Sequence, residues 1–123
     1  MTWLQHVNVV VPPGGTEAAA DFYQSVFSLV QQAKPAGTAS PTGAWLTLAG
    51  RQQIHISERT GDRHPDAHFA VVVEDFDGVL RRIAAAGATW QEQADVFGGR
   101  RGFPRDPAGN RIEVLEATGE LAG

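Results

Sequence analysis

The segment that decides the fold is Asp106-Pro107-Ala108-Gly109-Asn110-Arg111-Ile112-Glu113-Val114, a turn followed directly by a strand. Its Asp, Pro and Gly stand where a type I turn favours them. The alternation after the turn predicts a strand over 111–116, with Ile112 and Val114 on one face of a sheet. Glu113 then points to the other face, where a carboxylate is costly unless a cation or a metal ion meets it.

Working outward from this segment, the second half predicts a strand, a helix and further strands. Residues 68–73 form an apolar strand, Asp75 or Asp77 can cap the helix that follows, and Gly87 ends that helix. The helix stripe is Phe76, Val79, Leu80, Ile83 and Ala84. Further strands are expected near 88–91, over 101–105 and over 111–116.

The first half predicts the same order of elements. A strand over 3–11 places Val7, Val9 and Val11 on one face and His6 on the other. Thr16 can cap the next helix. That helix has the stripe Ala19, Phe22, Tyr23, Val26 and Phe27. A strand after Leu29, a loop over 35–43, and strands over 44–48 and 52–57 complete the half.

Each half is therefore predicted to be β-α-β-β-β, with an offset of roughly 60 residues between the copies. We expect an α+β protein with one domain over 1–123, built from modules over 1–59 and 66–118.

A formal net charge of −4 disfavours a nucleic-acid partner. The chain has no cysteine, and we expect neither a signal peptide nor a membrane span, so a cytoplasmic location is predicted.

Four polar residues lie at matching positions of the two predicted repeats. His6 and His68 open the first strands, whereas His55 and Glu113 lie in the last strands. A pseudo-twofold axis between the halves would bring the four together, and imidazole and carboxylate are ligands for Zn, Ni, Fe, Co or Mn. The alternative is that the histidines bond to backbone or solvent and that Glu113 faces water beside Arg111 or Arg101. His64 matches no repeat position and is interpreted as a surface residue.

Other features give weaker indications of a substrate. Arg101 and Arg105 alternate with Phe103, so both could hold an anion on one side of their strand, although solvated charges are the simpler interpretation. Trp45, Trp90, Phe97 and Phe103 could line an aromatic pocket, or they could belong to the core.

The sequence resembles the vicinal oxygen chelate superfamily, which groups glyoxalase, bleomycin-resistance and extradiol dioxygenase proteins. The similarity spans nearly the whole chain, and the segment over 106–114 is its most specific part. The other matching segments are His6-Val7-Asn8-Val9-Val10-Val11, Ala20-Asp21-Phe22-Tyr23, Gln53-Ile54-His55-Ile56 and His68-Phe69-Ala70-Val71-Val72-Val73-Glu74-Asp75.

The resemblance implies two βαβββ modules forming a U-shaped, largely antiparallel eight-stranded sheet around one divalent metal, usually in a homodimer. By position, His6, His68 and Glu113 are the implied ligands. His55 stands where glyoxalase I-like and epimerase-like members carry Glu or Gln, which argues against those two activities. It is either a fourth ligand or a general base, so His55 and Glu113 are the candidate catalytic residues.

On this scaffold the metal stabilises negative charge on vicinal substrate oxygens. The implied reactions are isomerisation, epimerisation, ring-opening dioxygenation and thiol addition to an epoxide antibiotic. We therefore expect a metal-dependent enzyme acting on a small oxygenated substrate. The alternative is a non-catalytic protein that binds a small molecule or an antibiotic.

Overall fold

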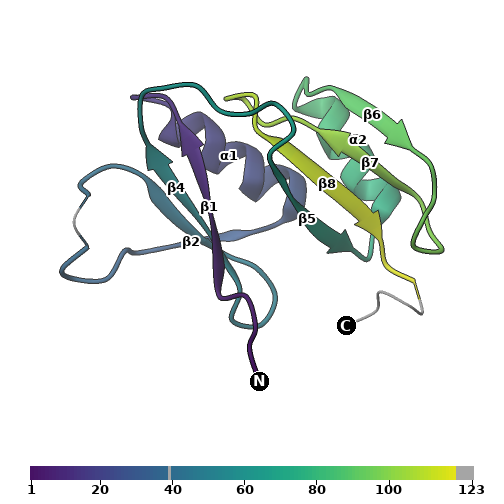
Figure 1. Cartoon of the computed structure of the whole chain (residues 1–123), viewed down its shortest axis with the longest axis horizontal. Coiled ribbons are helices and arrows are strands. Elements are labelled where there is room, and N and C mark those ends of the chain that lie inside the picture. Colours follow the sequence, from purple (N-terminus) through teal and green to yellow (C-terminus); the bar gives the residue numbers. More distant parts are fainter. Residues whose placement is uncertain (39, 119–123) are drawn as a thin grey trace. The chain divides into compact units, whose positions relative to one another are not determined.

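The computed structural model describes residues 1–38 and 40–118 of a chain that divides into two compact units, Met1–Asp62 and Arg63–Gly123. Each unit has the order strand, helix, then three strands (Figure 1). The predicted α+β class with two βαβββ modules is therefore confirmed. The eight expected strands form two four-stranded mixed sheets.

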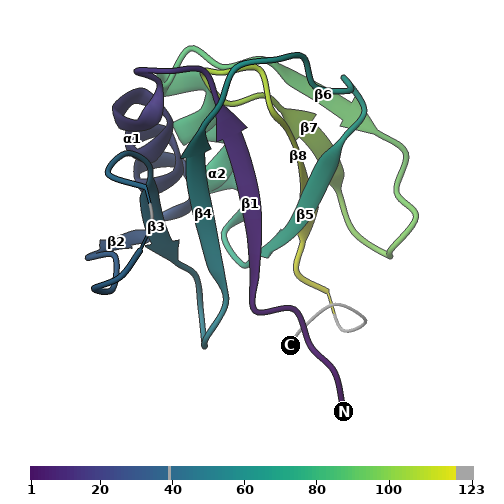
Figure 2. The same cartoon turned by 60° about the vertical axis from the view of Figure 1, so that its left-hand side comes forward.

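Unit 1 contains β1 (His6–Val11), α1 (Thr16–Phe27), β2 (Val30–Gln32), β3 (Ala44–Thr47) and β4 (Gln53–Glu58). Its sheet has the strand order β1-β4-β3-β2, visible in Figure 2. The strands β1 and β4 are parallel, whereas the other pairs are antiparallel. The first strand begins at His6, three residues later than predicted, because the stretch before it is exposed.

The sheet of unit 1 has one apolar and one polar face. Val9, Val11, Leu46, Ile54 and Ile56 are each at most 4% exposed, and helix α1 packs along β3 and β4. The alternation predicted for β1 is confirmed, because His6 and Asn8 lie on the opposite face from these valines. Along β4 the same alternation puts His55 on the polar face.

Thr16 does not cap helix α1, which corrects the prediction. The N-cap residue is Gly15, and no side chain bonds to the free backbone N–H groups there. The Thr16 hydroxyl instead donates to Glu58 Oε2 at 2.6 Å. A capping hydroxyl accepts a hydrogen bond from a free helix N–H. The Thr16 oxygen instead accepts from the Gly43 N–H at 3.2 Å, so contacts with distant residues replace the local one.

Unit 2 contains β5 (His68–Val73), α2 (Phe76–Ala85), β6 (Trp90–Gln93), β7 (Arg101–Pro104) and β8 (Arg111–Glu116). The strand order is β5-β8-β7-β6, with β5 and β8 parallel. The strands over 68–73 and 111–116 have the predicted bounds. The strand predicted near 88–91 instead covers 90–93, where it pairs with β7.

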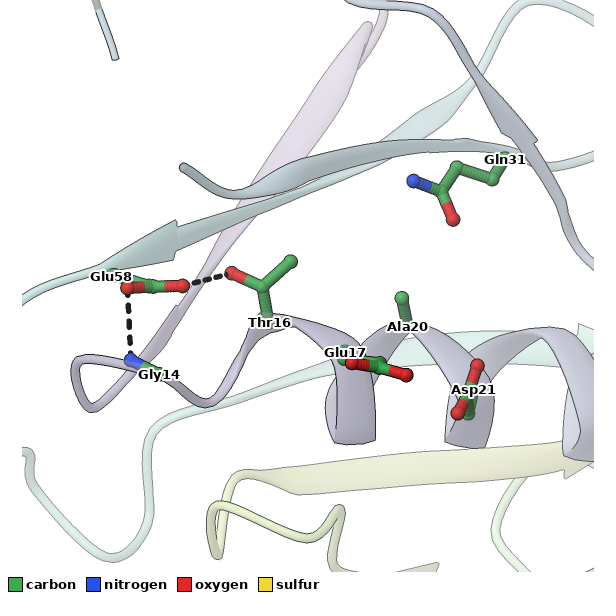
Figure 3. Close-up of a pocket in the computed structure, with 7 residues that line it drawn as sticks. All are labelled: Gly14, Thr16, Glu17, Ala20, Asp21, Gln31 and Glu58. Carbon is green, nitrogen blue, oxygen red and sulfur yellow. Dashed lines mark hydrogen bonds between the residues drawn. The ribbon is translucent and has the colours of Figure 1, made fainter. Parts of the chain in front are cut away.

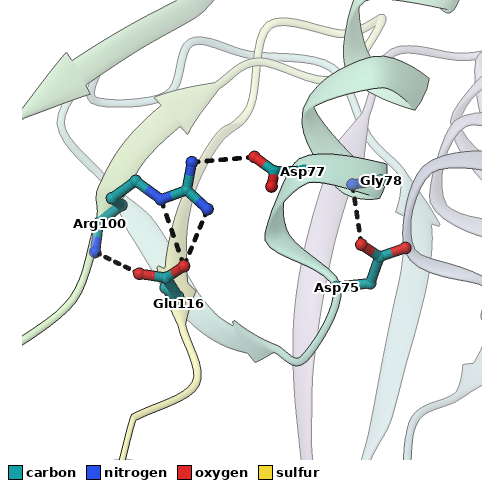
Figure 4. A network of polar contacts seen from close by, with 5 residues as sticks. All are labelled: Asp75, Asp77, Gly78, Arg100 and Glu116. Atoms are coloured by element: carbon teal, nitrogen blue, oxygen red, sulfur yellow. Dashed lines mark hydrogen bonds and ion pairs between the residues drawn. The ribbon is translucent and has the colours of Figure 1, made fainter.

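Helix α2 is fixed at both ends by local contacts. The Asp75 side chain accepts a hydrogen bond from the Gly78 N–H at 3.0 Å, which confirms Asp75 as one of the two predicted caps (Figure 4). Gly87 follows the helix with a φ of 71°, as expected for its stop signal. The predicted stripe is correct for Phe76, Val79 and Ile83 but wrong for Ala84, which is exposed.

The turn before β8 has the predicted construction. Asp106 is 5% exposed, and its Oδ1 accepts hydrogen bonds from the N–H groups of Ala108 and Asn110, both at 2.9 Å. Gly109 has a φ of 87° and donates its N–H to the Asp106 carbonyl. Because this turn is held by its own side chain, it delivers β8 in a defined register. None of the helices in the described ranges is long and apolar enough to cross a bilayer.

Candidate metal centre

In unit 1, the two predicted histidines belong to a stack of three rings on the polar face. His55 lies between His6 and Trp45, with a centroid distance of 4.0 Å to each neighbour. The register explains the stack, because His55 is the partner of Trp45 across β3 and β4, while β1 places His6 at the adjacent edge. Sequence reasoning identified the two histidines but missed the role of Trp45 as their stacking partner.

Hydrogen bonds determine which ring nitrogens stay free. His6 Nδ1 is 2.6 Å from Gln5 Oε1, and His55 Nε2 is 2.7 Å from Gln53 Oε1. Amide oxygens only accept, so each of these nitrogens donates. The free nitrogens are therefore Nε2 of His6 and Nδ1 of His55.

The stacked geometry restricts how the two rings can bind an ion. The lone pair of an imidazole nitrogen lies in the ring plane, and the planes of His6 and His55 are only 15° apart. An ion in line with one lone pair therefore lies out of the plane of the other ring. The prediction that His55 is a fourth ligand beside His6 requires its ring to leave the stack.

The pKa of His55 lies below its ordinary value of 6.5. Burial disfavours the charged imidazolium, and His6 adds a repulsive term when it is protonated. The His55 ring is thus held neutral near pH 7, with a free nitrogen that can accept a proton.

In unit 2, His68 and Glu113 lie next to each other on one face of the sheet. The distance from His68 Nε2 to Glu113 Oε1 is 3.4 Å. His68 Nδ1 is 2.8 Å from the Asp66 carbonyl oxygen, so Nδ1 donates and Nε2 is left facing the carboxylate. As predicted, Glu113 points away from the buried side chains of Ile112 and Val114.

The other Glu113 oxygen, Oε2, is held by Arg101, whose guanidinium donates to it at 2.8 Å. The two side chains are 18% and 12% exposed, so this is a largely buried ion pair. Arg101 also donates to the Ala94 carbonyl. Glu113 therefore contacts both an arginine, as the alternative interpretation expected, and His68.

The chemistry and spacing of this pair fit a divalent metal ion. Zinc binds imidazole nitrogen and carboxylate oxygen at about 2.0–2.2 Å, so two ligands of a tetrahedral ion lie roughly 3.3–3.5 Å apart. The observed 3.4 Å agrees with this spacing. A backbone acceptor on the second His nitrogen is the usual support of a ligating histidine. Within either unit, the described residues form no group of three or more His, Asp or Glu side chains that could hold an ion.

The predicted anion site of Arg101 and Arg105 is not formed. Arg101 is engaged by Glu113, and Arg105 donates to the carbonyl oxygens of Gly109 and Pro65. The guanidinium of Arg111 instead lies 3.7 Å from the ring centre of Phe103, on the His68 side of the sheet. Sequence reasoning named Arg111 only as a neighbour of Glu113.

The predicted aromatic pocket also differs from the structure. Trp90 meets the edge of Phe76 of helix α2. Its partner across β6 and β7 is Pro104, whereas Phe103 pairs with Gln91, so Trp90 and Phe103 face opposite sides of the sheet. Trp45 belongs to the ring stack of unit 1. Trp90 is therefore a packing residue, which was the alternative interpretation.

A pocket of about 370 Å³ in unit 1 is lined by residues of helix α1 together with Gly14, Gln31 and Glu58 (Figure 3). Its lining includes the carboxylates Glu17, Asp21 and Glu58. Hydrogen bonds from the Gly14 N–H and the Thr16 hydroxyl lower the pKa of Glu58. Two of its acceptor positions are thus used to anchor the start of helix α1, and the pocket contains none of the predicted ligands.

Comparison with known proteins decides the family. The family model described as the glyoxalase/bleomycin resistance protein/dioxygenase superfamily matches residues 3–114. The chain belongs to this superfamily. When the chain was compared with curated proteins, no match was found.

Several solved structures share the fold over nearly their whole length. A glyoxalase family protein from Bacillus anthracis is 28% identical with a TM-score of 0.84, covering 96% of this chain and 97% of the other. A fosfomycin resistance protein from Listeria monocytogenes is 23% identical with a TM-score of 0.74, covering 98% of each chain. An antibiotic binding protein from a Streptomyces species is 19% identical with a TM-score of 0.72, covering 96% and 98%. The fold is thus shared by a resistance protein and by an antibiotic binding protein.

Proposed function

We propose that this protein is a metal-dependent enzyme of the glyoxalase-like group that acts on a small oxygenated substrate. The observation that carries this proposal is the convergence of His68 Nε2 and Glu113 Oε1 at 3.4 Å, with Nδ1 of His68 held by a backbone carbonyl. A carboxylate and a fixed imidazole nitrogen are a suitable pair of ligands for a divalent ion.

We propose His68 and Glu113 as ligands from unit 2, and His6 as the ligand from unit 1 that the family resemblance implies. The ion would be Zn, Ni, Fe, Mn or Co. A divalent ion bound there would supply Lewis acidity that stabilises negative charge on a substrate oxygen. Arg101 would keep Oε2 of Glu113 in place, so that Oε1 stays directed toward His68.

We assign His55 the role of proton acceptor. Its lowered pKa keeps the ring neutral near pH 7, and its Nδ1 carries a free lone pair. The flanking rings of His6 and Trp45 restrict its rotation. A positioned neutral imidazole is an effective general base for a proton next to a polarised oxygen.

Metal analysis tests the ligand assignment. We expect a near-stoichiometric divalent metal in the parent protein, measured by elemental mass spectrometry on untagged material. His68→Ala should lose it, because the imidazole ligand is removed. Glu113→Gln should weaken binding at least about a hundredfold, since even outer-shell partners of a metal contribute tenfold to a hundredfold.

His64→Ala is the matched control for these variants. His64 is an exposed histidine of the same unit, and its Nδ1 accepts a hydrogen bond only from the nearby Asp66 N–H. Its loss should leave the metal content unchanged. The ligand assignment would be wrong if Glu113→Gln had the metal content of the parent protein, or if all three variants lost the metal equally.

The second candidate is a non-catalytic protein that binds a small molecule or an antibiotic. The Arg101–Glu113 ion pair favours it, because the carboxylate is neutralised without any metal. This candidate predicts a parent protein that takes up no divalent metal, even after unfolding and reconstitution. A turnover screen on small oxygenated substrates with the metal-loaded protein separates an enzyme from a metal-binding domain.

A further inference from the structure

The face of unit 2 that carries His68 and Glu113 has an organised group of charged side chains around one aromatic ring. Phe103 is 7% exposed and lies at the centre of this group, with the His68 ring meeting it edge-on at 5.3 Å. The guanidinium of Arg111 lies over the ring at 3.7 Å. We call the five residues His68, Arg101, Phe103, Arg111 and Glu113 the Phe103 cluster.

The strand register determines this arrangement. Arg111 is the cross-strand partner of His68 between β5 and β8. Arg111 and Glu113 are two residues apart in β8, so they share a face. Arg111 therefore lies beside both proposed ligands of unit 2.

The donors of Arg111 are the least engaged of the three arginines around this face. Arg101 is paired with Glu113 and Ala94, and Arg105 is paired with two carbonyl oxygens. Among the described residues, the nearest acidic atom to Arg111 is Asp66 Oδ1 at 3.8 Å, beyond hydrogen-bond distance, on a side chain that is 78% exposed. An ion pair of this kind contributes little in water.

The surroundings of Arg111 orient it for binding a ligand. Its side chain is only 19% exposed, and the face of Phe103 holds the guanidinium plane by a cation–π contact. A fixed, planar guanidinium offers paired N–H donors that match the two oxygens of a carboxylate. Because Arg101 and Glu113 cancel, the charge of Arg111 is offset among the described residues only by the exposed carboxylate of Asp66 at 3.8 Å.

We infer that Arg111 is the anion-recognition residue of this face and that it binds a carboxylate of the ligand beside His68 and Glu113. This inference names a carboxylate-bearing substrate for the proposed enzyme, and in that respect it rests on the proposed function. The anion site itself needs no metal, since it consists of the Arg111 guanidinium and the Phe103 ring on which that group lies.

Titration with benzoate tests the inference on full-length protein that has been stripped of metal and exchanged into metal-free buffer without a chelator, because EDTA carries carboxylates of its own. Benzoate is a planar carboxylate, and benzamide is its neutral analogue of nearly the same shape. Binding is followed by NMR shifts, including those of the Arg111 Nε–H group. We expect saturable binding of benzoate to the parent protein, and clearly weaker binding of benzamide.

Arg111→Gln should weaken benzoate binding roughly tenfold to a hundredfold, because a hydrogen bond between charged groups contributes about 1.5–3 kcal/mol. Benzamide affinity should stay the same. Arg111→Lys should recover part of the loss in benzoate affinity, since it keeps the charge without the paired donors. It also serves as the test if the Gln variant folds poorly.

Arg105→Gln is the matched control and should bind benzoate within about twofold of the parent, since the hydrogen bonds described for the Arg105 side chain go to backbone carbonyls.

Equal benzoate affinity of Arg111→Gln and the parent would overturn the inference. So would equal binding of benzamide and benzoate, or the lack of saturable benzoate binding by the parent. Because every titration uses metal-free protein, these outcomes are independent of the metal. A protein that binds benzoate through Arg111 and takes up no metal would retain this inference and lose the proposed enzyme.

Discussion

At the scale of single residues, each candidate site residue is held between partners from neighbouring strands. Glu113 lies between His68 and Arg101, and the His55 ring lies between His6 and Trp45. Glu113 was predicted to face away from Ile112 and Val114 because side chains in a strand alternate, and it does. The sequence offered Arg101 and Arg111 as neighbours of Glu113 but could not choose between them, because the contact with Arg101 depends on the pairing of β7 with β8. The ring stack of His55 similarly depends on the pairing of strands far apart in sequence.

The lowered pKa of His55 gives a prediction at this scale. We expect its ring to titrate below 6.5, and we expect His6→Gln to raise its pKa because one repulsive charge is removed. A lowered pKa means that the unfolded state binds more protons. The free energy of unfolding should therefore fall as the pH decreases from 6.5 toward the folded pKa, and less steeply in His55→Phe.

NMR titration of the imidazole C–H signals measures the first part, and urea unfolding at several pH values measures the second. A His55 midpoint at or above 6.5 would contradict the burial and the repulsion inferred from the ring stack.

At the scale of elements, the sequence predicted the helices better than their starts. Both stripes followed from a period of 3.6 residues, and Asp75 was correctly identified as a cap. Thr16 was wrongly assigned the same role, since its hydroxyl bonds to Glu58 in a strand 42 residues away. A helix-capping residue can be predicted from the neighbouring sequence unless a residue far away in the chain bonds to the same side chain.

The cap of helix α2 gives a prediction for this element. Asp75→Ala should lower the free energy of unfolding by about 1 kcal/mol, because the hydrogen bond to the Gly78 N–H is lost. Asp75→Asn is the control and should be nearly neutral, since Asn caps helices about as well as Asp. Urea denaturation measures both variants, and equal destabilisation by Asn and Ala would indicate that the charge, and not the cap, matters.

The start of β7 is fixed to the same helix by a second set of contacts. Arg100 donates to Asp77 of α2 at 2.9 Å and to Glu116 of β8, as Figure 4 shows. These contacts lower the pKa of both carboxyl groups and raise the pKa of Arg100. All three side chains are partly exposed, so we expect this network to weaken in high salt.

At the scale of the whole molecule, the order and periodicity of the elements predicted two similar modules despite negligible identity between the halves. The structure confirms two units with the same strand order, each closed by a parallel pair of its first and last strands. That parallel pairing was not predicted from the sequence, because periodicity reveals which face of a strand is buried but not which strands are neighbours.

We propose that the protein forms a homodimer, as the family resemblance implies. Sedimentation velocity should then give a mass near twice the 13.1 kDa of one chain, and dilution should dissociate it only at low concentration. A mass of 13.1 kDa at all concentrations would exclude the dimer.

The position of β4 and β8 has a consequence for synthesis on the ribosome. Each is the last strand of its unit to be made, yet each lies inside its sheet and pairs on both sides. Nascent chains therefore expose unpaired strand edges until the final segment of a unit emerges, and β5 has no strand partner until β8 has been synthesised. A premature stop codon ahead of Arg111 would remove the inner strand of unit 2 along with Glu113, and its product would be a substrate for chaperones and proteases.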